Sequence, residues 1–203
     1  MQEAAGFDQL WVPLTGSLVR LEPLAQSHEA GLWEAARESD WTWMPIDGGA
    51  SPAALRRWLD WLLQKAEERE IAPFATVRLA DGRVIGSTQC HDIRPEHGRL
   101  EIGGTWLAKS EWRTGANIDA KLIQLEHAFS LGYQRVEFKT HPENLRSRRA
   151  LQALPAQLEG ILRKHLLVRD GQPRDSAYYS VVDDEWPRVR ENLERRLGAL
   201  QAS

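Results

Sequence analysis

The sequence has little of several features that would commit it to a specialised class of protein. It contains one cysteine among 203 residues, so no disulfide can form within the chain. No apolar run is long enough to cross a membrane, and no secretory segment is visible, so we expect a protein of the reducing cytoplasm without a membrane partner. Internal repeats and low-complexity tracts are also absent. These absences favour an ordinary globular protein.

The chain also lacks an excess of positive charge. It has 26 Lys and Arg against 29 Asp and Glu, a formal charge of −3, and nucleic-acid binding needs a concentrated basic surface. We therefore expect no nucleic-acid partner. The six histidines show no paired ligand spacing and Cys90 has no candidate partner, so we expect neither a metal site nor a cysteine nucleophile.

What is present is the composition of a folded domain, with 42% hydrophobic and 27% charged residues. Residues 1–16 carry no clear period, so we expect a loosely held N-terminal arm before one domain at residues 17–203. Strand-like alternation and helical spacing then predict an α+β order in that domain. The expected strands are 18–23, 74–79, 83–93, 99–107, 135–140, 157–168 and 175–182, and the expected helices are 28–38 with Ser27 as N-cap, 51–70 opened by Ser51-Pro52, 118–131 stopped by Gly132, 144–154 and 185–200.

The most informative segment joins the strand at residues 102–107 to the helix that follows it. Between them lies a short basic turn, residues 112–117, with Gly115 near its end. A glycine lets the backbone approach an anion, and the unpaired N–H groups and dipole of a helix N-terminus favour negative charge. The arrangement predicts a phosphate-binding turn, although one glycine between strand and helix is also typical of a simple tight turn.

Five runs along the chain decide between these interpretations. Together with the element order they resemble the GNAT acyltransferases over about residues 17–200, and the RimJ/RimL-type branch in particular, some of whose members acetylate the N-terminal amines of ribosomal proteins. The runs are RTGANIDAKL at 113–122, HAF at 127–129, RVEFKT at 135–140, NLRSRRAL at 144–151 and DSAYYS at 175–180.

The resemblance implies the GNAT fold, an α+β structure whose mixed central sheet of about seven strands splays between the fourth and fifth strands. It implies acetyl-CoA as co-substrate, no metal, and transfer of the acetyl group to a primary amine by direct attack in a ternary complex. The family's phosphate motif reads Gln or Arg, any, any, Gly, any, Gly or Ala, and Trp112 and Asn117 depart from it. These departures keep open an alternative, a catalytically silent CoA-binding sensor or interaction module.

For CoA binding, the resemblance places the pyrophosphate on the backbone of the turn and the thioester carbonyl near the backbone of Trp106 and Leu107. It places Asn144 at the pantetheine arm or at the helix start, where its type also suits an N-cap. The expected CoA-binding residues are Trp106, Leu107, Arg113, Thr114, Gly115, Ala116, Asn117, Asn144 and Arg149, with Arg146, Arg148 and Lys121 as weaker candidates for the phosphates.

Acyl transfer also needs a group that takes a proton from the amine and a group that protonates the departing thiolate. On the family pattern, we expect Glu101 to be the base and Ser147 the proton donor. His91 and Asp92 are the next candidates for the base, and Tyr178 and Tyr179 the alternative donors.

The acceptor side is the least defined by the sequence. In this family the connection between the first two helices borders the acceptor, so Trp41, Trp43 and Met44 are expected to form an apolar wall, with His91 as a further substrate-binding residue. The acceptor is expected to be a peptide N-terminus or a small-molecule amine. The final hairpin, with its basic run at residues 163–165, offers a surface for a homodimer.

Overall fold

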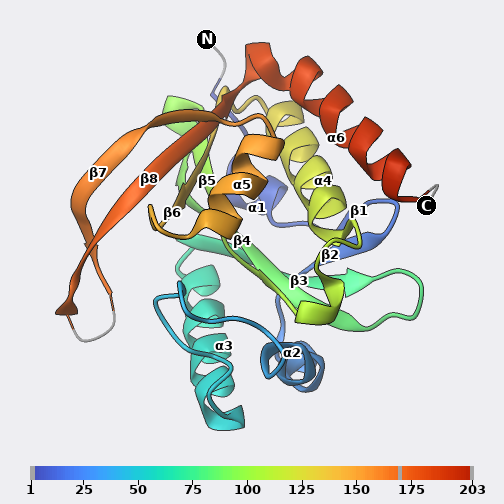
Figure 1. Cartoon of the computed structure of the whole chain (residues 1–203), viewed down its shortest axis with the longest axis vertical. Coiled ribbons are helices and arrows are strands. Elements are labelled where there is room, and N and C mark those ends of the chain that lie inside the picture. Colours follow the sequence, from blue (N-terminus) through green and yellow to red (C-terminus); the bar gives the residue numbers. More distant parts are fainter. Residues whose placement is uncertain (1–2, 169–170, 202–203) are drawn as a thin grey trace.

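The computed structural model describes residues 3–168 and 171–201, and a mixed eight-stranded sheet runs through it (Figure 1). The strand order is β1-β2-β3-β4-β5-β6-β8-β7, antiparallel except for the parallel pair β5 and β6. The strands are β1 (Leu14–Thr15), β2 (Val19–Pro23), β3 (Ile71–Arg78), β4 (Val84–Arg94), β5 (Arg99–Leu107), β6 (Arg135–Thr140), β7 (Gln157–Leu167) and β8 (Pro173–Val182).

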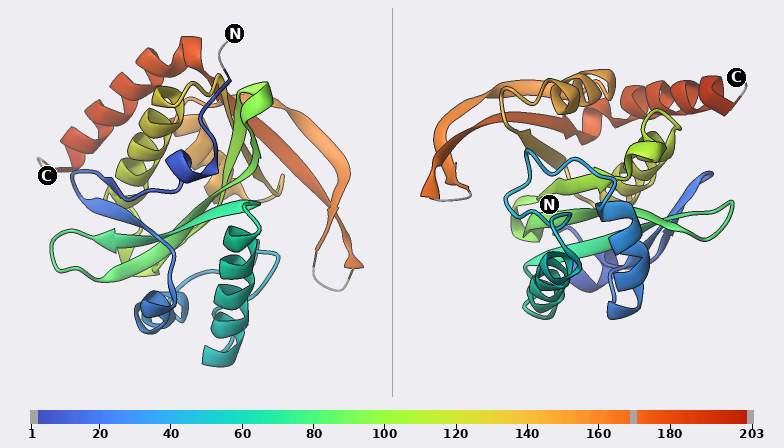
Figure 2. Two further views of the ribbon diagram at one scale, coloured as in Figure 1. Left: turned by 180° about the vertical axis from the view of Figure 1, so that it is seen from behind. Right: turned by 60° about the horizontal axis from the view of Figure 1, so that its bottom comes forward.

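Helices cover both faces of the sheet. Figure 2 shows α2 and α3 on one side and α4, α5 and α6 on the other. The larger hydrophobic core lies under α4 and α6 and the smaller one under α2 and α3. The helices are α1 (Phe7–Leu10), α2 (Glu29–Ala36), α3 (Pro52–Glu67), α4 (Ala116–Ser130), α5 (Leu145–Ala153) and α6 (Trp186–Gln201). Within the described residues, none of these helices combines the length and apolar character that crossing a bilayer requires.

Local sequence chemistry sets most helix ends. The Ser51 side chain accepts a hydrogen bond from the backbone N–H of Ala54 ahead of α3, and Gly132 follows α4 with φ +87°, so both predicted boundaries are confirmed. The prediction that Ser27 is the N-cap of α2 is wrong. Ser27 lies inside a 3₁₀ turn, Gln26–His28, and the side chain of His28 instead accepts from the N–H of Ala25.

The N-terminal arm is not loosely held over the residues that the structure describes. Phe7 and Leu10 are buried in the larger core, and the hydroxyl of Tyr133 donates to the carbonyl of Ala5 at 2.9 Å. The indole N–H of Trp11 donates to Pro73 O at 2.7 Å. The arm also contributes β1, which makes the sheet eight strands rather than the expected seven. Apolar residues without a period find partners here that only the folded sheet provides.

The sheet divides between β5 and β6. These strands pair only from Arg99 to Glu101 on β5, opposite Arg135 to Glu137 on β6, and beyond these residues β5 continues to Leu107 without a β6 partner. This is the predicted splay between the fourth and fifth strands of the main sheet, and we call it the β5/β6 divergence. It leaves one side of the β5 backbone free of strand hydrogen bonds.

Candidate active site

A bulge in β5 accompanies the divergence. The register with β4 shifts between Gln89, which pairs Gly103, and Ser87, which pairs Trp106, and Gly104 has φ +56°. An extra residue bends a strand and reverses the alternation of its side chains. Ile102 consequently faces the larger core, whereas Trp106, four residues later, is buried with α2 and α3. Adjacent glycines within a strand are the sequence signal for such a bulge.

Lys121 of α4 forms hydrogen bonds with both strands at this bulge. Its amine donates to the hydroxyls of Thr88 and Thr105 at 3.0 Å each and to the side-chain oxygen of Gln124 at 2.9 Å. Burial lowers the pKa of Lys121 to about 7. Only 6% of its surface is exposed, so the hypothesis that Lys121 contacts the CoA phosphates is wrong.

The turn from β5 to α4 has a row of free backbone donors. Arg113 and Gly115 both adopt left-handed conformations, with φ +68° and +97°, which turns the chain sharply into the helix. Within the part of the chain that the structure describes, no hydrogen-bond partner satisfies the backbone N–H groups of Arg113, Thr114, Gly115, Asn117 and Ile118. The N–H of Ala116 donates to the Thr114 hydroxyl at 3.3 Å. This predicted donor is therefore already occupied. Free amides at a helix N-terminus fit an anionic group.

The Trp112 side chain, which departs from the family motif, has a structural role at this turn. Its ring lies under the guanidinium of Arg146, whose Cζ is 4.1 Å from the ring centroid, and Arg146 also approaches Asp40 at 3.2 Å. This contact links the turn to the start of α5.

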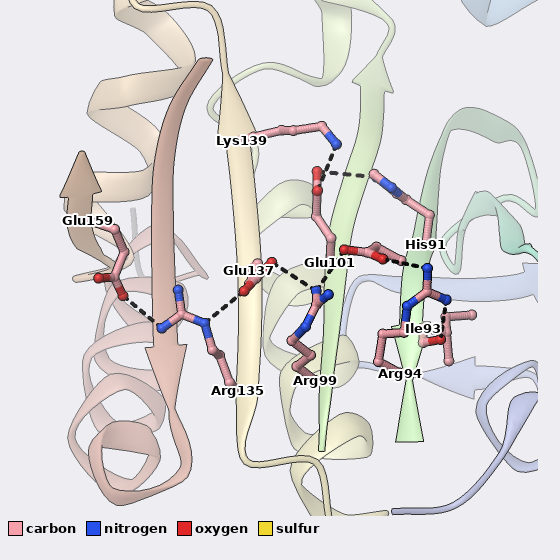
Figure 3. Close-up of polar contacts among 10 residues, drawn as sticks. His91, Ile93, Arg94, Arg99, Glu101, Arg135, Glu137, Lys139 and Glu159 are labelled. Carbon is pink, nitrogen blue, oxygen red and sulfur yellow. Dashed lines mark hydrogen bonds and ion pairs between the residues drawn. The ribbon is translucent and has the colours of Figure 1, made fainter. Parts of the chain in front are cut away.

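Glu101 lies at the point where β5 and β6 separate. Only 1% of it is exposed, and its Oε2 accepts a hydrogen bond from Lys139 Nζ at 2.8 Å (Figure 3). His91 Nε2 is 3.3 Å from the other oxygen, Oε1. Burial raises the pKa of Glu101, and the charge of Lys139 opposes that rise. Burial likewise lowers the pKa of His91 to about 4, so His91 is neutral near pH 7 and lies beside the expected base.

Charged residues continue across the same face of the sheet (Figure 3). Arg99 contacts Asp92 at 2.6 Å and Glu137 at 3.5 Å, and Arg135 contacts Glu137 and Glu159 at 2.8 Å each. Asp92, the alternative base, is therefore held by Arg99. Burial raises the pKa of Tyr178, which also lies on this face, to about 12.

The start of α5 lies beside the end of β6. Asn144 is its N-cap, as its residue type predicts, and its side-chain oxygen accepts from the backbone N–H of Ser147 at 3.1 Å. Ser147 is half-buried, and its hydroxyl takes no part in this cap. Arg148 donates to the hydroxyl of Tyr179 and to Pro142 O, so Arg148 and Tyr179 have structural roles, whereas Arg149 is exposed.

The residues of the predicted apolar wall differ in burial. Trp41 is 5% exposed and packs against Trp58 and Trp106, with ring centroids 6.0 and 4.8 Å away. It is a core residue, which corrects the expectation that it binds substrate, and the Trp106 side chain belongs to the same cluster. Trp43 is half-buried and lies 4.7 Å from the ring of His141 near α5, and Met44 packs at the edge of the smaller core.

No group of three or more His, Cys, Asp or Glu side chains within residues 3–168 and 171–201 could hold a metal ion. The buried thiol of Cys90 has its pKa raised to about 12 by burial. A thiol in that state is a poor nucleophile.

A comparison with known protein families identifies the domain to which this fold belongs. Residues 19–157 match the model of the acetyltransferase (GNAT) domain. The chain belongs to the GNAT acetyltransferases. It is similar to a GCN5-related N-acetyltransferase from Brucella melitensis, at 33% identity and a TM-score of 0.83 over 92% of this chain and 86% of that one. A second solved structure, an acetyltransferase from T. thermophilus, is 38% identical over 91% of this chain and 96% of that one, with a TM-score of 0.79.

Other GNAT relatives align less completely or less closely. An uncharacterized N-acetyltransferase, p20 of Bacillus licheniformis, is 34% identical over 114 residues, 56% of this chain and 63% of the relative, so the match spans less than two thirds of that protein. RimJ of Mycobacterium smegmatis shares the fold, with a TM-score of 0.72 at 24% identity over 91% of this chain and 92% of RimJ. A relative of the RimJ/RimL type thus has the same architecture. Acetyl-CoA is the co-substrate of this family.

Proposed function

We propose that this protein transfers an acetyl group from acetyl-CoA to a primary amine, by direct attack of the amine within a ternary complex. The observation that carries the proposal is the row of unpaired amides at the start of α4, next to an unpaired edge of β5. The similar M. smegmatis RimJ is described in complex with a CoA disulfide, which supports CoA as the ligand here.

The residues present fit CoA. The amides of the β5–α4 turn suit its diphosphate, the exposed Arg149 suits a further phosphate, and the free β5 edge suits an extended amide-bearing arm. Ala108 N donates to Ile85 O in β4, and successive N–H groups of a strand point to opposite sides. The N–H of Leu107 therefore points toward the β5/β6 divergence and suits an acyl oxygen. The residues that would hold CoA are Leu107, Arg113, Thr114, Gly115 and Asn117 through their backbone N–H groups, with Asn144 and Arg149. The backbone of Trp106 faces β4 and the N–H of Ala116 is taken by Thr114, so these two predicted residues do not fit this role.

When bound, acetyl-CoA supplies a thioester whose carbonyl carbon accepts the amine. Glu101 takes a proton from the amine, directly or through water, as the C–N bond forms. The Leu107 N–H stabilises the developing charge on the acyl oxygen. As the C–S bond breaks, the Ser147 hydroxyl protonates the sulfur and regains a proton from solvent water. His91, neutral beside Glu101, together with Trp43 and Met44 at the rim, contacts the acceptor. A peptide α-amine has a pKa near 8, well below that of a lysine side chain, so a weak base can deprotonate it more easily.

A thiol-release assay with acetyl-CoA against peptides and small amines tests the proposal, and calorimetry with CoA tests the phosphate-binding turn separately. Asn117→Pro removes one amide donor in the first turn of α4, where proline is tolerated, and Asn117→Ala keeps that donor while removing the side chain. We expect the proline variant to bind CoA about tenfold more weakly and the alanine variant to bind normally.

The silent CoA-binding sensor is the second candidate, and the altered motif at Trp112 and Asn117 favours it. It predicts normal CoA binding, no thiol release with any amine, and no effect of Ser147→Ala. Absence of CoA binding would contradict both candidates.

A further inference from the structure

Arg174 of β8 is a buried cation without a partner among the described residues. Only 9% of it is exposed, and its Nε has no hydrogen-bond partner. Within residues 3–168 and 171–201, its guanidinium makes no hydrogen bond and no ion pair at all. Burial lowers the pKa of Arg174, and the charge of Glu101 opposes that change, so Glu101 lies within electrostatic range. A buried charge without a hydrogen-bond or ion-pair partner is unfavourable in a folded protein, and a bound anion would offset that cost.

The strand register places Arg174 on the face of the sheet that carries the expected base. Arg174, Ser176 and Tyr178 alternate along β8 and so share a face. Tyr178 pairs with Lys139 of β6, and Lys139 donates to Glu101. The opposite face of β8, with Ala177 and Tyr179, is filled by the larger core. Arg174 therefore faces the same side as Glu101, away from α4.

The carboxylates on this face are already occupied. Glu101 accepts from Lys139, and Asp92 and Glu137 contact Arg99. Glu137 and Glu159 also contact Arg135. Of the basic residues described on this face, Arg174 is left over. A planar guanidinium matches the two oxygens of a carboxylate in shape and charge.

We propose that Arg174 binds a carboxylate of the acceptor, so that the preferred acceptor amine carries a carboxylate group. This inference rests on the proposed function and narrows its substrate class. The carboxylate belongs either to a free amino acid or to an acidic residue of a peptide. The two sources present the same chemistry to Arg174 and differ in the distance between amine and carboxylate.

Paired acceptors test this directly. Amino acids are compared with their carboxamides, and peptides with Asp or Glu near the N-terminus with the corresponding Asn or Gln peptides, in the thiol-release assay. We expect the carboxylate member to have a kcat/KM about tenfold higher or more, mainly through KM. Whichever kind of acceptor shows the preference, amino acid or peptide, identifies the source of the carboxylate.

Arg174→Met, of similar volume, should abolish the preference by raising KM for the carboxylate member alone. Arg163→Met, an exposed residue of β7, is the matched control and should leave it intact.

A binding measurement covers the case in which turnover is absent. In the presence of CoA, N-acetyl amino acids or acidic N-acetyl peptides should raise the melting temperature of the unchanged protein and not that of Arg174→Met, whereas the neutral amides should raise neither. Arg174→Met itself should melt at the same or a higher temperature, since a buried unpaired charge is replaced by an apolar side chain.

The inference would be overturned if the carboxylate and amide acceptors had equal kcat/KM, or if Arg174→Met lowered kcat/KM equally for both. Either result would leave acetyl transfer established. Carboxylate stabilisation without acetylation of any amine would overturn the proposed function and leave Arg174 as a carboxylate-binding residue without an acceptor. A lower melting temperature for Arg174→Met with an unchanged acceptor preference would assign Arg174 a structural role only.

Discussion

Lys139 Nζ donates to Glu101 Oε2 at 2.8 Å across the point where β5 and β6 part. Glu101 is opposite Glu137 in the parallel ladder, so Lys139, two residues further along β6, extends back to it over the beginning of the divergence. The contact has two consequences. It ties the two separating strands together, and the charge of Lys139 favours the carboxylate form of Glu101, opposing the rise in pKa that burial causes. An ionised Glu101 is the form that accepts a proton.

Glu101→Gln should lower kcat about 100-fold or more while leaving CoA affinity unchanged, because the amide keeps the shape of the side chain and cannot accept a proton. Steady-state kinetics and calorimetry with CoA measure the two quantities. The variant leaves Lys139 without its partner, so Glu101→Gln/Lys139→Met is the control for that effect. A kcat close to that of the unchanged protein would remove Glu101 from the mechanism.

Lys139→Met should move the pH dependence of kcat/KM toward higher pH. Lys139 lowers the pKa of Glu101 against the effect of burial, so removing its charge raises that pKa further. A higher pKa leaves less carboxylate at a given pH, and the rising limb of the profile shifts upward. Arg188→Met, an exposed change of the same charge on α6, should leave the profile in place. A downward shift or no shift would contradict the assigned contact.

Lys121→Met should change how stability depends on pH. In the folded protein the pKa of Lys121 is about 7, below its value in an unfolded chain. Between these two pKa values the unfolded state binds more protons, so stability of the unchanged protein increases as pH rises from 7 toward 10. The increase between pH 7 and 9 is about 2 kcal/mol for such a group, and Lys121→Met should lack it. Urea unfolding at both pH values measures the difference, and parallel curves for the two proteins would refute it.

Gly115→Val should destabilise the fold as well as weaken CoA binding. Gly115 has φ +97°, and a Cβ there would lie 3.0 Å from Leu18 Cδ1 and 3.1 Å from Leu197 Cδ1. The backbone strain alone costs about 1–3 kcal/mol. Gly198→Ala, in open space on α6, should stabilise the protein by about 0.5–1 kcal/mol instead. Thermal unfolding of both variants tests this contrast, and an unchanged melting temperature for Gly115→Val would show that the turn tolerates a side chain.

Much of the architecture follows from local patterns. The strands at 99–107 and 135–140 and the caps at Ser51 and Asn144 are where the sequence predicts them, because alternation and capping act over a few residues. Local patterns do not predict the structure of the arm at residues 1–16. Its apolar residues have no period, and their burial depends on surfaces formed by distant strands.

The candidate site divides in the same way. The resemblance of the chain to its family points to Glu101, Ser147 and the turn. Nothing local indicates that Lys139 supports Glu101, or that Arg174 lies on the same face with no partner in the described part of the chain. Trp41 is predicted to bind the acceptor but is a core residue, because an aromatic residue in a loop can either line a binding site or fill the hydrophobic core.

The sequence by itself determined the order of strands and helices, the glycine that permits the turn before α4, and the caps that start α3 and α5, because each depends on backbone conformation over a single turn. Only the tertiary structure decided which charges meet and left Arg174 without a partner among the residues that it describes. The β5/β6 register brings Glu101 to Lys139, and the strand order places Arg174 on their face. A side chain alternates along its own strand, but its neighbours across the sheet are set by pairing between segments far apart in the chain.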